Sequence, residues 1–182
     1  ARLGLLKSIE KVTDHKDISM NEEMFNQIEI WKALYKGYYG EWHDVTYHTI
    51  EGPKQRKMMT LNMAKTSAAE MASLVYNEKC EISIDDDNIA EFIEEVFKQN
   101  KFDKKFQDYL EYSFAHGGMV VKPYVENDQI MLSFVTADCF IPISWRNDTI
   151  NEAVFPFEFR KRDKKYTHLE WHLWEDGDYI IR

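Results

Sequence analysis

The residues best suited to chemistry lie near the end of the chain, in the segment His168-Leu169-Glu170-Trp171-His172. In a β-strand alternate side chains point to the same face, so the two imidazoles and the carboxylate would project together. Two histidines and one carboxylate form a known ligand set for iron. However, same-face neighbours on a strand lie about 7 Å apart with roughly parallel side chains, so they converge poorly on one ion. The pattern favours the polar outer face of a strand; a metal-dependent enzyme using His168, Glu170 and His172 is the alternative.

Other motifs that could do chemistry fail on spacing or context. A calcium loop beginning at Asp85 needs a glycine at its sixth position and a glutamate at its twelfth, where this sequence has Ala90 and Val96. Asp85-Asp86-Asp87 is instead expected to cap a helix. His43 and Asp44 are adjacent, so they rarely face each other as a base and its orienting carboxylate. The sequence also lacks nucleophile-elbow, phosphate-loop and dinucleotide signatures, and we predict no catalytic residue, metal site or cofactor.

The composition is that of a soluble, acidic globular protein. The chain has 182 residues, a formal net charge of −9, 44% hydrophobic residues and 14% aromatic residues. Residues 1–66 hold 10 Lys/Arg and 9 Asp/Glu, whereas residues 67–182 hold 13 and 23. The basic clusters at 54–57 and 160–162 are short, so we expect solvated faces rather than a nucleic-acid patch. No apolar run approaches the roughly 20 residues of a membrane span, so no membrane partner is expected.

Cysteine and aromatic positions give two further expectations. Cys80 and Cys139 are far apart and match no metal spacing, and no secretory signal opens the sequence. We expect both to be buried thiols in a reducing compartment. Phe155, Phe157 and Phe159 occupy alternate positions and are expected to lie in the core, with an assembly surface as the alternative.

Apolar spacing predicts helices in the N-terminal half of the chain. A capping box at residues 19–22 opens a helix that we expect to end at Gly40, and a second helix is expected over residues 62–76. A third follows the three aspartates, and a fourth is closed by Gly117-Gly118. Short strands are expected over 45–50, 57–61 and 81–84, and residues 1–18 as a short helix or loose arm.

From Met119 onward the apolar period changes to two, which predicts antiparallel strands. Hairpins are expected over residues 119–135 and 152–175, with a further strand over 139–144. Asp176-Gly177 is typical of another tight turn, followed by a strand that stops at Arg182. Helices followed by antiparallel hairpins indicate the α+β class. Because the last strand is barely begun, we expect the sequence to be a piece of a longer chain.

Several segments follow one another as they do in a known family. They are Tyr38-Tyr39-Gly40-Glu41-Trp42-His43, Leu61-Asn62-Met63-Ala64-Lys65, Leu74–Cys80, Ala115-His116-Gly117-Gly118 and Phe134–Ile143. The first is similar to the family's Tyr-Tyr-x-Gly-x-His segment, with Gly40 one position early, and the second to its Asn-x-x-Lys helix start. The last resembles a strand ending in an apolar-Pro-apolar pattern. Together, over about residues 20 to 175, they resemble the amino-terminal part of tailed-phage portal proteins, especially the siphophage portal family.

The resemblance implies a virion structural protein, not an enzyme. Such proteins form a homo-oligomeric ring of about twelve subunits at one capsid vertex, through which double-stranded DNA is packaged and ejected. The implied partners are the terminase, the capsid and scaffolding proteins and the head-completion proteins, with assembly in the host cytoplasm. Another phage head or adaptor protein with the same module is the alternative.

The resemblance also implies a division of the chain. Residues 1–18 would form the N-terminal arm, and residues 19–182 a wing-like domain. The stem and clip regions of the family would follow beyond Arg182. Residues that contact DNA or terminase are expected there, so no binding residue is assigned in this chain.

Overall fold

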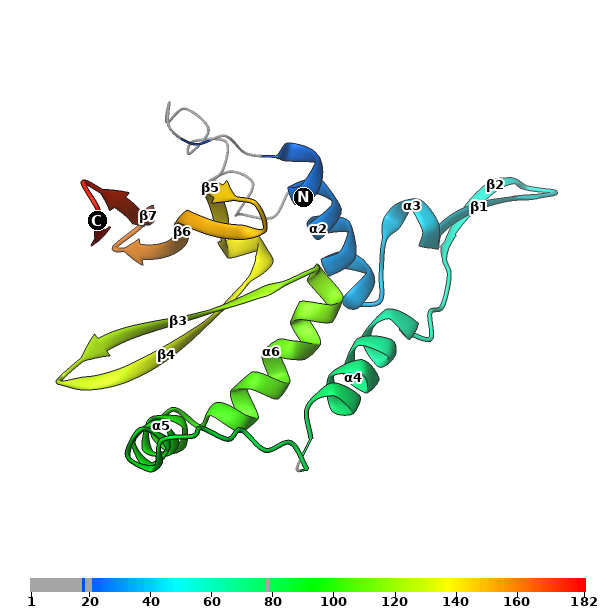
Figure 1. Cartoon of the computed structure of the whole chain (residues 1–182). Coiled ribbons are helices and arrows are strands. Elements are labelled where there is room, and N and C mark those ends of the chain that lie inside the picture. The colour runs from blue at the N-terminus through cyan, green and yellow to red at the C-terminus, as the bar shows by residue number, and fades with distance from the viewer. Residues whose placement is uncertain (1–17, 19–20, 78) are drawn as a thin grey trace. The chain divides into compact units, whose positions relative to one another are not determined.

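The computed structural model describes residues 18, 21–77 and 79–182, arranged as two compact units. One unit contains residues 27–136, and the other contains residues 137–182 with the described residues up to Asn26. Helices occupy the N-terminal half and antiparallel strands the C-terminal half, which confirms the predicted α+β class (Figure 1). The arm expected over residues 1–18 lies, apart from Ile18, outside the described residues.

Helix α2 (Glu22–Tyr35) ends earlier than predicted. Asn21 caps it, because its side-chain oxygen accepts a hydrogen bond from the Met24 amide at 3.1 Å, while Ser19 of the predicted capping box lies outside the described residues. The predicted end at Gly40 is wrong. Gly37 has a φ of 85°, and the amide of Tyr38 donates to the Ala33 carbonyl at 3.1 Å, which closes the helix in a Schellman motif. Gly40 instead begins the short helix α3 (Gly40–His43).

The other three predicted helices are confirmed as α4 (Met63–Val75), α5 (Asp87–Asn100) and α6 (Phe102–His116). The Asp86 carboxylate caps α5 by accepting hydrogen bonds from the amides of Asn88 and Ile89. Gly117, with a φ of 88°, ends α6 as predicted. The aspartate run is therefore a helix cap.

The core of residues 27–136 forms where α4, α5 and the hairpin β3–β4 meet α6. Two small residues of α4, Ala68 and Ala72, are buried, which lets this helix lie close to α6. The Phe102 ring stacks on Phe97 with centroids 4.1 Å apart and on Phe106 at 5.0 Å. Phe134 of β4 lies 5.9 Å from the same ring. One aromatic side chain thus joins two helices and a strand.

Two hairpins belong to these residues. The strands β1 (Asp44–Thr49) and β2 (Gly52–Lys57) pair antiparallel, as do β3 (Met119–Glu126) and β4 (Gln129–Thr136). The predicted strand over 57–61 is wrong because the turn falls at Ile50-Glu51, which places β2 five residues earlier. Residues 81–84 are predicted as a strand but pair with none of the described strands, so they form no strand.

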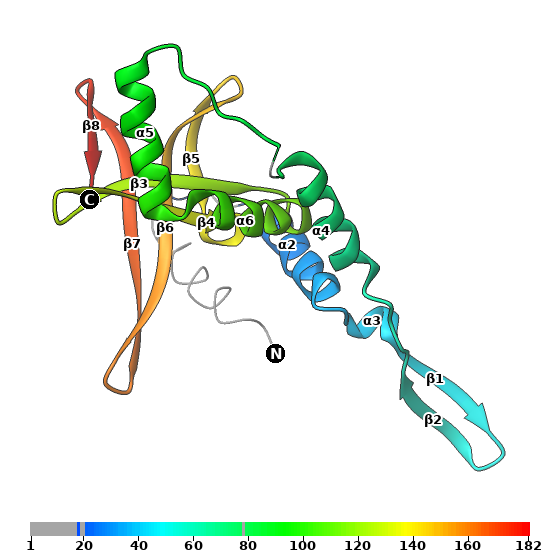
Figure 2. The same ribbon diagram turned by 90° about the horizontal axis from the view of Figure 1, so that it is seen from below.

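The second unit contains a four-stranded antiparallel sheet in the order β5-β6-β7-β8. Its strands are β5 (Ile141–Arg146), β6 (Thr149–Lys161), β7 (Lys164–Glu175) and β8 (Asp178–Ile181). The predicted hairpins and the Asp176-Gly177 turn are confirmed, whereas Cys139 lies in the 3-10 turn η1 (Ala137–Cys139) rather than in a strand. Strands β6 and β7 continue beyond their outer neighbours as a two-stranded ribbon (Figure 2).

Burial corrects two predictions. Phe155 is buried, but Phe157 and Phe159 are exposed because they lie in the ribbon, where no outer strand flanks β6 and β7. The expectation of a core stripe therefore holds for one of the three phenylalanines. Both cysteines are thiols; Cys80 is exposed and Cys139 is half-buried, so the expectation that both are buried is wrong.

Candidate functional site

The structure brings together two residues of the predicted strand motif and leaves the third apart. His172 and Glu170 interact directly, with Nε2 of the ring 2.7 Å from Oε1 of the carboxylate. The Tyr179 hydroxyl of β8 lies against Nδ1 of the same ring. His168 is not part of this group, because its ring stacks on Phe157 with centroids 4.5 Å apart.

His172 is a core residue, which corrects the prediction of a polar outer face. The residue is 6% exposed, and its ring meets the Phe155 ring edge to face at 4.9 Å. Because the Glu170 carboxylate can only accept a hydrogen bond, Nε2 carries the proton in the neutral ring and Nδ1 accepts from Tyr179. Burial, followed by the Glu170 charge, raises the pKa of Tyr179. The group is a satisfied polar network that joins β7 to β8.

The alternative of a metal-dependent enzyme therefore loses its ligand set. His168 has a stacking partner, and each ring nitrogen of His172 has its own oxygen partner. Within residues 18, 21–77 and 79–182, no three His, Cys, Asp or Glu side chains gather so that they could hold a metal ion.

His43 and Asp44 likewise have separate partners. The Tyr39 amide donates to Nδ1 of His43 at 2.9 Å, whereas the Asp44 carboxylate accepts a hydrogen bond from the Tyr38 hydroxyl at 2.5 Å. The two side chains form hydrogen bonds around the α3 turn. They do not form a general base with its orienting carboxylate. The basic clusters at 54–57 and 160–162 are exposed throughout.

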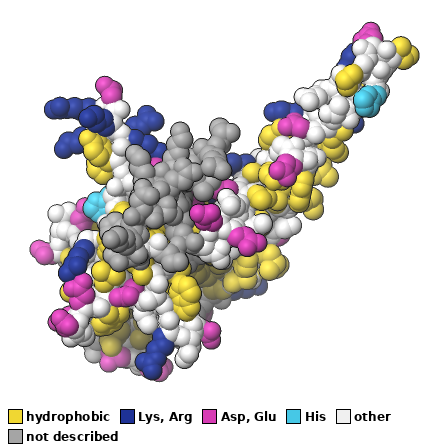
Figure 3. All heavy atoms as spheres, turned by 90° about the horizontal axis from the view of Figure 1, so that it is seen from above, with side chains coloured by type: hydrophobic (Ala, Val, Ile, Leu, Met, Phe, Trp, Pro, Cys, Tyr) yellow, Lys and Arg dark blue, Asp and Glu magenta, His cyan; other side chains and the backbone are white. Residues whose placement is uncertain are grey.

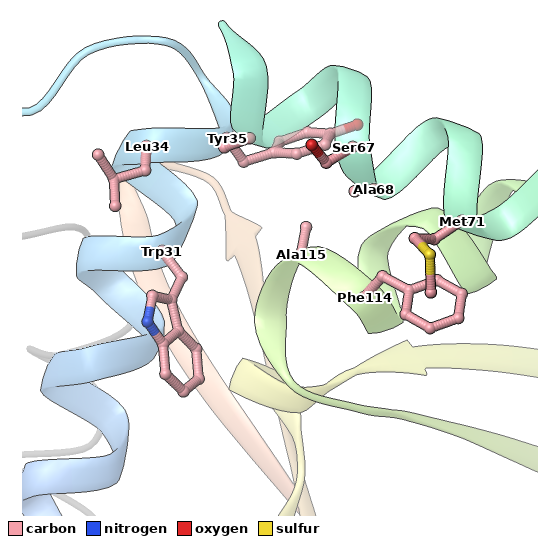
Figure 4. Close-up of a pocket in the computed structure, with 9 residues that line it drawn as sticks. Trp31, Leu34, Tyr35, Ser67, Ala68, Met71, Phe114 and Ala115 are labelled. Atoms are coloured by element: carbon pink, nitrogen blue, oxygen red, sulfur yellow. The ribbon is translucent and has the colours of Figure 1, made fainter.

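An apolar hollow in residues 27–136 lies between α2, α4 and α6 (Figure 4). Its volume is about 310 Å³, and it is lined by Trp31, Leu34, Tyr35, Ala64, Ser67, Ala68, Met71, Phe114 and Ala115. The Tyr35 hydroxyl donates to Glu111 at 2.5 Å, and burial together with this bond raises the pKa of Tyr35 well above its usual range. A lining of this kind accommodates apolar side chains and offers no acid–base group that titrates near neutrality.

Several structural contacts had no signal in the sequence. The Tyr35–Glu111 bond joins residues 76 positions apart, and the Tyr76 hydroxyl donates to Asp103 at 2.6 Å across 27 positions. Burial and this carboxylate raise the pKa of Tyr76 to about 12. Sequence spacing reveals neighbours within one element, and only the packing of α2, α4 and α6 reveals these pairs.

A family model described as "Phage portal protein, SPP1 Gp6-like" matches residues 14–179. The chain belongs to this phage portal protein family. The match confirms the resemblance predicted from the motifs and covers most of the sequence. No curated protein and no solved structure matches the chain.

Membership of the portal family gives the chain a structural role in the phage virion, within a capsid-associated oligomeric assembly. Among the helices that the structure describes, none is long and apolar enough to cross a membrane. The polar groups described above form hydrogen bonds with one another, which is consistent with this role.

Proposed function

We propose that this chain is the wing region of a portal ring at one capsid vertex, through which double-stranded DNA is packaged and ejected. The observation that carries the proposal is the portal family match over residues 14–179. Residues 19–182 form the wing in this proposal, and residues 1–18 form an arm ahead of it. The chain has no catalytic role of its own and acts by shape and assembly.

The negative charge of the chain supports a channel that does not bind the DNA passing through it. Phosphate binding needs clustered cations, and each cation that neutralises a phosphate makes binding tighter and more salt-dependent. The chain has a net charge of −9, so on balance it repels the DNA backbone. DNA therefore passes without sequence-specific contacts in this proposal.

The partners in this proposal are sibling subunits, the terminase, the capsid and scaffolding proteins and the head-completion proteins. Assembly takes place in the host cytoplasm, and the mature ring stays at the portal vertex. The position of the gene separates a portal from another head protein, because a portal gene normally follows that of the large terminase subunit.

Native mass spectrometry and electron microscopy of the intact gene product test the proposal. We expect closed rings of about twelve subunits, since identical head-to-tail contacts close when the rotation per subunit divides a full turn. An intact product that stays monomeric at high concentration would contradict the proposal.

A further inference from the structure

The bonds of residues 38–58 tie α3 and the hairpin β1–β2 into one body, which is called the hairpin module from here on. The Met58 amide donates to the His43 carbonyl at 2.7 Å, so the end of β2 is fastened to the end of α3. The ammonium group of Lys57 lies over the Tyr38 ring, 4.4 Å from its centroid, in a cation–π contact. Both ends of the segment are therefore bonded within the segment itself.

The remaining interactions of the hairpin module also stay inside it. They join Tyr38 to Asp44, Tyr39 to His43, Tyr39 to Trp42, Tyr47 to Arg56, Thr49 to Gly52 and Glu51 to Lys54. Within the described part of the chain, no side chain of the module forms a hydrogen bond, ion pair or ring contact with a residue outside it. None of the module's residues is buried. Interactions of these kinds therefore do not fix its direction relative to the helices.

Two short connections join the hairpin module to the helices. On one side, Gly37 follows the last turn of α2 and has a φ of 85°. On the other side, residues 59–61 are all exposed, Met59 to 98% and Leu61 to 87%. They lead to Asn62, which has a φ of 49° and precedes the first residue of α4. Side chains this exposed bury almost no surface against a neighbour, so the second connection is weakly held.

The two connections meet at one place. A Cβ atom on Gly37 would lie 3.2 Å from the Asn62 side chain, so the chain leaves and re-enters the helical part through adjacent residues. Beyond this junction the helices are held together, because Tyr35 of α2 is bonded to Glu111 of α6 and α4 packs on α6. A self-contained module joined to packed helices at a single junction is the arrangement of a hinge.

We propose that the hairpin module turns as one body about this junction, so that Gly37 and residues 59–62 form a hinge. Hinges are a few residues at the ends of elements that absorb changes in φ and ψ. The hairpin projects from the helices, so a rotation moves its turn at Ile50 furthest (Figures 1 and 3). A hinged module can meet a neighbouring surface at more than one angle, which a fixed one cannot. This inference goes beyond the proposed portal function and does not depend on it.

Pulsed electron paramagnetic resonance on the full chain tests the hinge, with nitroxide labels on pairs of exposed positions. The background carries Cys80→Ser and Cys139→Ser, because Cys80 is exposed and would be labelled. The hinge pair is His48→Cys in β1 with Asp108→Cys in α6. Two control pairs share its positions: Glu41→Cys with His48→Cys inside the module, and Glu70→Cys with Asp108→Cys inside the helical part.

The hinge pair should give a distance distribution at least about twofold wider than either control pair, because it alone of the three spans the junction. A hinge pair as narrow as the helical control would overturn the inference, since the module would then be fixed in one direction. A module pair as wide as the hinge pair would also overturn it, since the hairpin would then bend instead of turning as one body. None of these outcomes bears on ring formation, so the portal function is tested separately.

Glycine substitutions locate the hinge. Met59→Gly with Leu61→Gly should widen the distribution of the hinge pair further and leave both control pairs unchanged, because glycine reaches more backbone conformations. Ile82→Gly is the matched control, since Ile82 is another exposed apolar residue outside any helix or strand, in the connection between α4 and α5. It should leave the hinge pair unchanged. A hinge-pair width that responds equally to both variants, or to neither, would overturn the assignment of the hinge to these residues.

Discussion

At the scale of single residues, buried polar side chains connect elements that are distant in sequence. The Asn100 amide donates to the carbonyls of Val96 at 2.8 Å and Ile130 at 2.9 Å, and its oxygen accepts from the Leu132 amide at 2.8 Å. This one side chain ties the end of α5 to the edge of β4. His172 makes a similar link over a short span, from β7 to the next strand, β8.

Replacing Asn100 by leucine should destabilise the protein by about 1–3 kcal/mol, because the Ile130 carbonyl and the Leu132 amide lose their partner in a buried place. Urea unfolding followed by circular dichroism measures the change. Gln99→Leu, at the exposed neighbouring position, is the control and should stay within about 0.5 kcal/mol. Equal effects of the two substitutions would contradict the proposed link.

Glu152 gives the protein an acid-sensitive contribution to stability. The Ser144 hydroxyl at 2.7 Å, then the Trp174 amide at 3.0 Å, lower the pKa of this carboxyl below 4.5. Because the folded-state pKa is lowered, Glu152 contributes to the unfolding free energy at pH values above 4.5. That contribution is lost as the pH falls through the folded-state pKa. The difference in unfolding free energy between the parent and Glu152→Gln should therefore be largest near neutrality and shrink in acid. A difference that does not vary with pH would count against this explanation.

At the scale of elements, the ends of helices are set by backbone conformation as much as by side-chain pattern. Gly37 and Gly117 end α2 and α6 in the left-handed region that glycine tolerates. Gly117 also meets Trp31, since a Cβ on Gly117 would lie 3.1 Å from the indole ring. A single position thus closes one helix and allows another to approach.

Gly117→Ala should lower stability by about 1–3 kcal/mol, because alanine is strained at a φ of 88° and its methyl group would press on the Trp31 ring. Gly118→Ala is the matched control, since no atom lies within 4 Å of its Cβ position and its backbone is not in the left-handed region. Thermal unfolding compares the two, and a smaller loss for Gly117→Ala than for Gly118→Ala would refute the argument.

At the scale of the whole molecule, a structural role predicts independence from metal ions. Protein purified without chelator should contain no stoichiometric iron, manganese or zinc, and His168→Ala should leave ring assembly unchanged, because His168 stacks on an exposed phenylalanine. Elemental analysis and native mass spectrometry measure these quantities. Stoichiometric metal that His168→Ala removes would favour the enzyme alternative.

Secondary structure was predictable where a local pattern is sufficient. The stripe of Ile89, Phe92, Val96 and Phe97 repeats at helical spacing, and Asp86 supplies a cap within the same few residues. The strand over 81–84 was predicted from local pattern alone and does not form, because a strand also needs a partner edge. The end of α2 was misplaced because Gly37 and Gly40 are both suitable by residue type, and hydrogen bonds of the last turn select Gly37.

The sequence by itself determined the α+β class, the positions of most helices and hairpins, and the family, through the order of short motifs along the chain. These depend on residue periods, turn chemistry and motif order, all of which are local. Only the tertiary structure decided that His172 is buried, that His168 lies apart from it, and that Met59 and Leu61 are exposed. Burial depends on which distant elements cover a side chain. The alternation of residue types along one strand or helix does not show which elements those are.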